Sequence, residues 1–110
     1  MNELSRREEQ LLLIIGYLGK DAYLVAIRKQ LSFIMRKECS IGAVHIPLTR
    51  LEKSGQIMSS LGESTAVRGG RRKKIYRLTP LGEAALQENK RMHDFLWADF
   101  RGVRSSSGGI

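Results

Sequence analysis

A short internal segment of the chain concentrates positive charge. Residues 64–79 contain six lysines and arginines and no acidic residue, whereas residues 1–63 hold nine basic and seven acidic side chains and residues 80–110 hold four of each. Most of the net charge of +8 therefore lies in this segment. A basic run is often only a solvated or disordered tail. This one is internal and leads directly into an alternating pattern at 75–79, as in a strand, so it is suited to meet a polyanion.

Two strand patterns flank the basic segment. Residues 57–63 and 73–78 are predicted to be strands, and residues 64–72, which include Gly69 and Gly70, are predicted to link them as a long hairpin loop. Thr79 and Pro80 then form a strong helix-start signal, because threonine caps a helix and proline fits its first position. The last helix is predicted over 80–101.

Apolar residues at helical spacing predict three helices before the hairpin. They cover residues 4–19, residues 21 to about 31 or a little beyond, and residues 40–53. Residues 32–39 are ambiguous, and a short strand near 38–40 is one option. The predicted order is therefore three helices, a strand, a basic loop, a strand and a helix.

Local signals mark the ends of these helices. Asp21 and Ser40 are expected to cap the second and third helices, and Gly19 and Gly55 to end the first and third. Pro47 lies inside the third helix and removes one backbone hydrogen bond. We expect it to bend that helix or loosen its first turn rather than divide it in two.

Composition excludes several classes of protein. Cys39 is the only cysteine, so the chain cannot form an internal disulfide. The longest apolar run, residues 11–15, is far shorter than the ~18 residues that span a bilayer, and the glutamates near the N-terminus do not fit a signal peptide. We therefore expect a small cytoplasmic domain rather than a secreted, membrane-bound or multidomain protein.

Enzymatic signals are absent from the sequence. Cys39, His45 and His93 do not follow a recognised metal-ligand spacing, and no nucleophile elbow, paired-carboxylate motif or phosphate-binding glycine motif occurs. Cys39 is better explained as a small buried apolar residue. We expect no catalytic residues, no metal and no cofactor.

Three helices followed by a two-stranded hairpin form the winged version of the helix-turn-helix. The expected fold class is thus mainly α with a small β-hairpin. It combines a winged helix-turn-helix with a long C-terminal dimerisation helix.

Several segments resemble the PadR family of bacterial transcriptional regulators. The most specific is Arg-Gly-Gly-Arg-Arg-Lys-Lys-Ile-Tyr-Arg-Leu-Thr-Pro-Leu-Gly at 68–82, which is similar to that family's wing and following helix start. Residues 22–27 resemble its second helix, and residues 40–44 and 48–55 resemble its recognition helix. The sequence departs from the family at Leu24, where glycine is usual, and at His45, where tyrosine is usual.

The resemblance covers roughly residues 5–90 and implies a homodimer that binds an inverted-repeat operator in double-stranded DNA, mostly as a repressor. Small members of the family have a single C-terminal helix, which fits a chain of 110 residues. We therefore expect a winged-helix domain over 1–79, a dimerisation helix over 80–103 and a flexible tail over 104–110.

A protein that reads DNA needs contacts to phosphates for affinity and contacts to base edges for sequence preference. We expect the third helix and the wing to supply them. The predicted DNA-binding residues are Ser40, Gly42, Ala43, His45, Ile46, Thr49, Arg50 and Lys53 of the helix, and Arg68, Arg71, Arg72, Lys73 and Lys74 of the wing. Alternatively, Arg50 pairs with Glu52 or a phosphate beside the wing, or is merely solvated.

The last helix is about 30 Å long at 1.5 Å per residue and stays apolar to its far end. Such a stripe is expected to be buried in a dimer. The predicted interface residues are Leu4, Leu11, Leu81, Ala85, Met92, Phe95, Leu96 and Phe100. Trp97 is a candidate for an effector pocket, because small PadR-like regulators often respond to aromatic or drug-like ligands; plain interface packing is the alternative.

Other winged helices bind proteins or RNA. A protein-binding member is expected to carry an exposed apolar patch on its third helix and a short or neutral wing. RNA binding favours aromatic stacking platforms, but only Tyr76 lies near this wing and its alternation directs it toward the core. The basic wing favours DNA.

Overall fold

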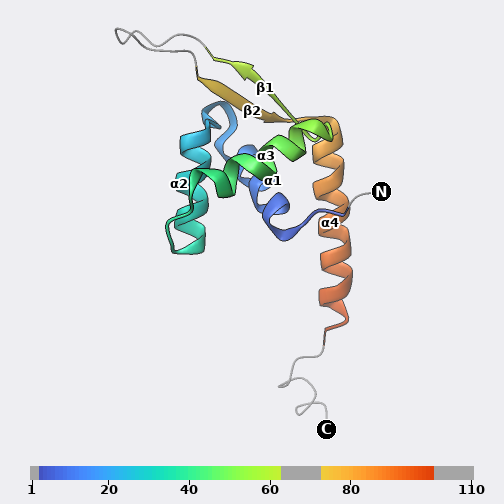
Figure 1. Cartoon of the computed structure of the whole chain (residues 1–110). Helices are drawn as coiled ribbons and strands as arrows, with labels where there is room; N and C mark the ends of the chain where they lie inside the picture. Colours follow the sequence, from blue (N-terminus) through green and yellow to red (C-terminus); the bar gives the residue numbers. More distant parts are fainter. Residues whose placement is uncertain (1–2, 63–72, 101–110) are drawn as a thin grey trace, which may run out of the picture.

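The computed structural model describes residues 3–62 and 73–100. Three helices come first: α1 (Arg6–Leu18), α2 (Leu24–Met35) and α3 (Ile41–Lys53). Strands β1 (Ile57–Leu61) and β2 (Lys74–Leu78) form an antiparallel hairpin, and helix α4 (Pro80–Ala98) follows. Figure 1 shows the hairpin at one end of the molecule and α4 running away from it. The predicted order of helices and strands is confirmed, and so is a mainly α fold class with a small β-hairpin and a C-terminal helix, whereas the predicted loop at 64–72 lies outside the described residues.

Side-chain caps fix where three of the helices begin. Ser5 and Glu8 form a reciprocal capping box at the start of α1. Ser40 accepts a hydrogen bond from the Ala43 N–H at 3.1 Å, and Thr79 accepts one from the Gly82 N–H at 3.1 Å. The predicted caps at Ser40 and Thr79 are therefore confirmed.

Glycine ends α1 and α3 as predicted. Gly19, with φ of 60°, follows α1, and Gly55, with φ of 81°, lies two residues beyond α3. Both φ values lie in the region that glycine enters without steric cost. Pro47 lies inside α3, which continues through it as one helix, and its ring is buried.

The prediction for the start of α2 is wrong. Asp21 does not cap α2 but lies in a short 3-10 turn, Gly19–Asp21. Tyr23 is the extended residue before α2, and it forms an isolated bridge with Ile75 of β2. The Tyr76 N–H also donates to the Ala22 carbonyl at 3.0 Å. Pairing with the distant hairpin keeps this segment extended, so α2 begins only at Leu24.

Other boundaries also differ from the predictions. The optional strand at 38–40 does not form. Helix α2 ends at Met35, a little beyond Leu31 as predicted, and Arg36 follows it in the left-handed conformation. Strand β1 ends at Leu61 rather than at residue 63, and β2 begins at Lys74 rather than at residue 73. Helix α4 ends at Ala98 rather than at residue 101.

The core lies between the first three helices and the hairpin. Tyr76 faces inward as its alternation predicts, and Cys39 is buried. Leu11 is fully buried in this core, so its predicted contact with a second chain is wrong. The buried cluster comprises Leu11, Leu12, Ile14, Ile15, Ala22, Ile27, Leu31, Cys39, Val44, Leu48, Leu51, Ile57 and Tyr76.

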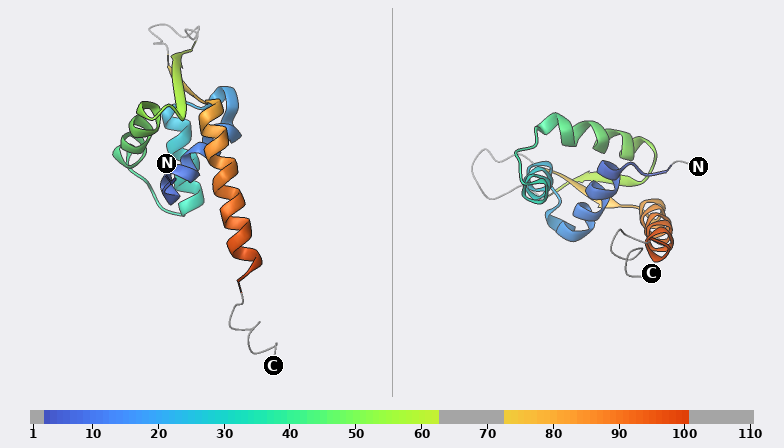
Figure 2. Two further views of the ribbon diagram at one scale, coloured as in Figure 1. Left: turned by 90° about the vertical axis from the view of Figure 1, so that its right-hand side faces the viewer. Right: turned by 90° about the horizontal axis from the view of Figure 1, so that it is seen from below.

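The start of α4 is joined to the turn between α3 and β1. The Thr79 hydroxyl donates to the Gly55 carbonyl at 2.6 Å, and the Thr79 N–H donates to the Gln56 carbonyl at 3.1 Å. Gly82 is buried against Gln56, and a Cβ atom there would collide with the Gln56 carbonyl oxygen. Beyond this junction, α4 extends past the helical core (Figure 2).

We predict that Gly82→Ala lowers the free energy of unfolding by about 1–3 kcal/mol, the usual cost of overpacking a close contact. The backbone of Gln56, rather than a flexible side chain, blocks the added methyl group. Urea denaturation measures the effect.

Gly42→Ala is the matched control, because the nearest atom to a Cβ there is the Ser40 Oγ at 4.0 Å. It should be neutral or stabilise the helix by up to about 1 kcal/mol. Equal stability of the two variants would contradict the proposed packing role of Gly82.

Candidate nucleic-acid interface

Helix α3 divides into an inner and an outer face. Val44, Pro47, Leu48 and Leu51 are buried. On the opposite side, four exposed residues follow one another at intervals of four, three and four positions: Gly42, Ile46, Thr49 and Lys53. This spacing aligns them along the helix. We call these four residues the outer stripe of α3.

His45 and Arg50 are exposed on either side of the outer stripe. In residues 3–62 and 73–100, Arg50 forms no ion pair, and Glu52 instead accepts a hydrogen bond from the Ser59 hydroxyl at 2.6 Å. The alternative pairing of Arg50 with Glu52 is therefore not found. Arg50 is free to meet an anion supplied by a ligand.

Internal hydrogen bonds limit what two of the predicted DNA-binding residues can offer. The Thr49 hydroxyl donates to the His45 carbonyl at 3.0 Å, one turn earlier. The Ser40 hydroxyl caps α3 through the Ala43 N–H. Ala43 itself is half-buried, whereas Gly42 opens directly to solvent.

Arg28 of α2 holds the turn that precedes α3. Its Nη1 donates to the Cys39 carbonyl at 3.1 Å and lies 4.0 Å from the Glu38 carboxylate. The Cys39 N–H is held in turn by the Ser32 hydroxyl at 3.0 Å. Sequence periodicity places Arg28 on the outside of α2, but its side chain is mostly buried. Its positioning role depends on a contact eleven residues away, which periodicity does not reveal.

The loop end of the hairpin, where Lys74 pairs with Leu61, presents cations beside tyrosine rings. The Lys73 ammonium lies 5.4 Å from the centre of the Tyr23 ring, and the Lys74 ammonium lies 6.0 Å from the centre of the Tyr76 ring. Both lysines are exposed. These cation–π contacts help to orient the two ammonium groups. Three further predicted wing residues, Arg68, Arg71 and Arg72, lie outside the described residues.

A hydrogen bond ties α3 to the hairpin. The Ser59 hydroxyl of β1 bonds to Glu52 of α3, and Ser59 pairs with Tyr76 across the hairpin. Burial, followed by the negative charge of Glu52, raises the pKa of Tyr76. The outer stripe and the lysines at the base of the wing are thus carried by one connected unit.

The described residues hold neither a metal-binding cluster nor a membrane-spanning helix. Among the described residues, no group of three or more histidine, cysteine, aspartate or glutamate side chains is arranged to hold a metal ion. None of the described helices is long and apolar enough to cross a membrane.

Comparison with known families decides the assignment. The model of the Transcriptional regulator PadR-like family matches residues 11–88, which is more than half of the chain. The chain belongs to the PadR-like family. The match runs from α1 into α4 and includes the outer stripe of α3 and the lysines at the loop end of the hairpin.

Solved PadR-like structures share the fold. A PadR-like transcription factor from Bacteroides fragilis is 27% identical, with a TM-score of 0.66, over 86% of this chain and 88% of that one. A PadR family regulator from Clostridium difficile is 29% identical, with a TM-score of 0.60, over 83% and 91%. A PadR-like regulator from Bacillus cereus, 23% identical over 84% of each chain with a TM-score of 0.68, supports the fold alone. No curated protein matches the chain.

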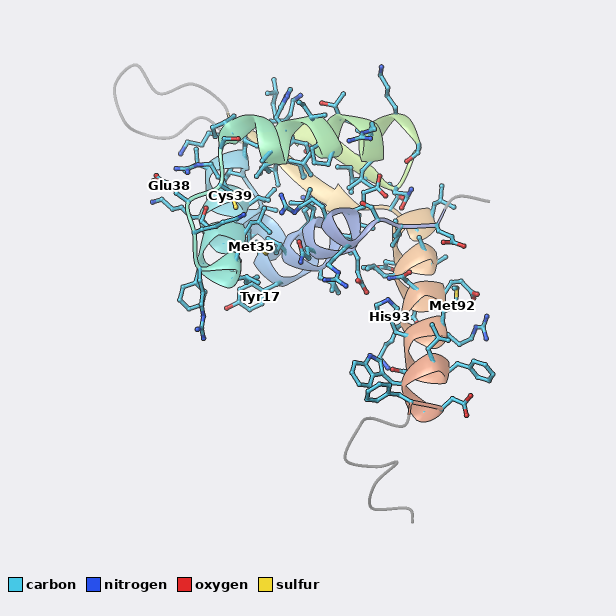
Figure 3. All side chains as sticks on the ribbon, turned by 60° about the horizontal axis from the view of Figure 1, so that its bottom comes forward. Tyr17, Met35, Glu38, Cys39, Met92 and His93 are labelled. Carbon is cyan, nitrogen blue, oxygen red and sulfur yellow. The ribbon has the colours of Figure 1, made fainter. Side chains whose placement is uncertain are left out.

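The far end of α4 lies beyond the PadR-like match and exposes large apolar side chains. Phe95, Leu96, Trp97 and Phe100 are all exposed, and the Trp97 and Phe100 rings meet edge to face with centres 5.1 Å apart. Met92 and His93 point to different sides of α4 (Figure 3). Leu96 follows Met92 by four positions, and Trp97 follows His93 by four, so Leu96 and Trp97 also lie on different sides of the helix.

Each side of α4 borders a groove. One groove, of about 750 Å³, lies between α4 and the N-terminal segment and is lined by Leu4, Leu81, Ala85 and Met92 among others. The second contains Leu13 of α1 with His93 and Trp97 of α4. The first groove thus brings together four predicted interface residues, Leu4, Leu81, Ala85 and Met92, whereas Trp97 lines the other groove.

Proposed function

We propose that this PadR-like chain is a sequence-specific repressor that binds an inverted-repeat operator as a homodimer. Family membership already makes it a transcriptional regulator with a DNA-binding fold. The observation that carries the finer proposal is the outer stripe of α3, an uncovered helix face flanked by Arg50 and linked to a hairpin with exposed lysines at its loop end.

The two parts of this surface have different tasks in the proposal. The outer stripe, with His45 and Arg50, enters the major groove and reads base edges. The helix start at Ser40, Gly42 and Ala43 allows close approach of the backbone. The wing contacts phosphates, through Lys73 and Lys74 and through the sequence-predicted Arg68, Arg71 and Arg72.

We predict that Lys73→Gln and Lys74→Gln weaken binding to specific and random duplexes alike. Each loss of a phosphate contact should reduce the slope of log K against log salt by about 0.9 per bound chain. Fluorescence anisotropy titrations at several salt concentrations measure this slope.

Lys90→Gln is the control, because it removes the same charge from α4, where Lys90 pairs with Asp94 at 2.6 Å. Its slope should equal that of the unmodified protein. If all three variants gave the same slope, the assignment of Lys73 and Lys74 to phosphate contacts would be wrong.

The function itself is tested by titration against the promoter of the protein's own gene and of neighbouring genes, with random duplex as competitor. Tight binding that survives the competitor supports a sequence-specific regulator. Reduced transcription from the bound promoter supports repression. Binding that is equal on random DNA and collapses with salt contradicts operator recognition.

The dimer part of the proposal rests on the exposed end of α4. Apolar side chains of this size in one patch are seldom left in solvent by a monomer. Leu4, Leu81, Ala85, Met92, Phe95, Leu96 and Phe100 remain the proposed interface residues. A two-fold dimer would present two α3 helices about 34–36 Å apart, one turn of DNA.

We predict that the unmodified protein sediments as a dimer at micromolar concentration and that Leu96→Glu sediments as a monomer. A carboxylate buried without a partner in an apolar interface is strongly unfavourable. Phe33→Glu is the control, since Phe33 is an exposed aromatic residue of α2 outside α4, and this variant should stay dimeric. A monomeric unmodified protein would refute the dimer.

The proposal also includes a small aromatic effector that binds beside Trp97. Trp97 has its indole exposed and lines the second groove with Leu13 and His93. Flat apolar surface of this kind suits a planar ligand. In the alternative, the ring only packs in the dimer interface.

We predict saturable quenching of Trp97 fluorescence by at least one member of a panel of planar cationic aromatic dyes. Trp97 is the only tryptophan, so the signal reports on this site alone. N-acetyltryptophanamide, titrated in parallel, corrects for absorption by the dye. Absence of saturable quenching across a varied panel would favour plain packing.

One observation favours the alternative function, a winged helix that binds protein or RNA without operator specificity. Ile41 and Ile46 of α3 are exposed, and apolar residues on the third helix are the feature expected of a protein-binding member. The exposed lysines at the loop end of the hairpin favour DNA instead. The competition titration above separates the two, because only operator recognition survives random duplex.

The remaining parts of the proposal follow from a regulatory role. We propose a cytoplasmic protein with no catalytic activity and no cofactor. Residues 1–79 would form the DNA-binding domain and residues 80–103 the dimerisation helix; the tail predicted at 104–110 lies outside the described residues.

A further inference from the structure

We propose that the outer stripe of α3 recognises its operator half-site through the 5-methyl groups of thymines, with Ile46 as the main contact and Thr49 as the second. This inference rests on the proposed DNA-binding function and names the base feature that α3 reads.

Ile46 is the most informative residue of the outer stripe. Its side chain is 59% exposed, although an isoleucine gains nothing from water, and it stands opposite the buried face of α3. The preceding residue of the stripe, Gly42, has no side chain, so nothing on the stripe screens Ile46 from the direction of the helix start. Isoleucine cannot hydrogen-bond to a base edge, and the one apolar group in the major groove is the thymine methyl.

The next residue of the stripe supports the same reading. Thr49 lies three positions after Ile46, and its hydroxyl proton is used on the His45 carbonyl. It therefore has no donor left for a base and presents a methyl group and an acceptor oxygen. The middle of the outer stripe thus offers two adjacent apolar groups and no free side-chain donor.

Charge makes duplex DNA the suitable occupant of this apolar surface. Lys53 ends the outer stripe, and Arg50 lies beside it. The exposed Lys73 and Lys74 stand at the loop end of the hairpin that is joined to α3. Glu52 is the one acidic residue within α3. It is half-buried and accepts a hydrogen bond from the Ser59 hydroxyl. Apolar groups bordered by cations are complementary to thymine methyls bordered by phosphates.

The experiment begins with selection of bound duplexes from a random pool by the full chain. Each thymine of the selected half-site is then replaced singly by deoxyuridine, which keeps the base pair and removes only the methyl group. Fluorescence anisotropy gives the affinity of each duplex. We expect one or two positions at which the replacement weakens binding about fourfold, the equivalent of exposing one methylene-sized group.

Protein variants locate the contact. In Ile46→Ala, the difference between the thymine and uracil duplexes should fall to within the error of measurement. Ile34→Ala is the matched control, because Ile34 is a similarly exposed isoleucine, at 49%, in α2. It should keep the fourfold difference.

Thr49 is tested by two opposite changes. Thr49→Val replaces the hydroxyl with a methyl group and should preserve both affinity and the preference for thymine. Thr49→Ser removes the methyl group and should reduce the preference at its own position. A loss of affinity in Thr49→Val without a loss in Thr49→Ser would mean that the hydroxyl, not the methyl, is read.

The outcomes distinguish this inference from the proposed function. If selection returns a preferred sequence but no uracil replacement changes the affinity, thymine recognition is wrong and operator recognition stands. If the preference for thymine persists in Ile46→Ala and Thr49→Ser, the assignment to these residues is wrong. If selection returns no preferred sequence, both the function and this inference are overturned.

Discussion

Four elements of the protein meet at the backbone of Gln56. Helix α3 ends just before it, β1 begins just after it, and Thr79, between β2 and α4, bonds to it and to Gly55. Gly82 brings the first turn of α4 directly against the Gln56 carbonyl. The hairpin and α4 therefore leave from one fixed point at the end of α3. This junction sets the direction of the surface proposed for DNA and of the helix proposed for dimerisation.

Helix α3 packs against the core with one face and exposes the opposite face. Val44, Leu48 and Leu51 fix its rotation, because turning it would expose them to water. Arg28 holds the turn before it, and the bond from Ser59 to Glu52 holds its second half against β1. The outer stripe is consequently oriented by contacts that no DNA ligand would touch.

Helix α4 changes character along its length. Its first turn is anchored at the Gln56 junction, whereas all residues from Arg91 to Phe100 are exposed. Ion pairs join Lys90 to Asp94 and Glu88 to Arg91, and the hydrogen bond from Arg91 lowers the pKa of Glu88. Exposed pairs of this kind stabilise a helix only slightly. The apolar end of α4 is therefore stabilised little by its own domain, and contact with a second chain would bury its apolar side chains.

Local chemistry determined much of this fold from sequence alone. Ser40, Thr79 and Pro80 start helices and Gly19 and Gly55 end them, because capping and positive φ act within a few residues. The concentration of charge in residues 64–79 and the spacing of the outer stripe also follow directly from the sequence. The order of elements, and with it the winged helix-turn-helix, could be predicted for this reason.

Contacts between distant residues decided the rest. Tyr23 stays extended because it pairs with Ile75, so Asp21 cannot cap α2. Arg28 is drawn inward by the Cys39 carbonyl, although periodicity places it outside, and Leu11 belongs to the core of its own chain rather than to an interface. Gly82 is required only because the Gln56 carbonyl, 26 positions earlier, lies where a side chain would begin. Sequence patterns describe what one segment prefers, and only tertiary structure determines which segments meet.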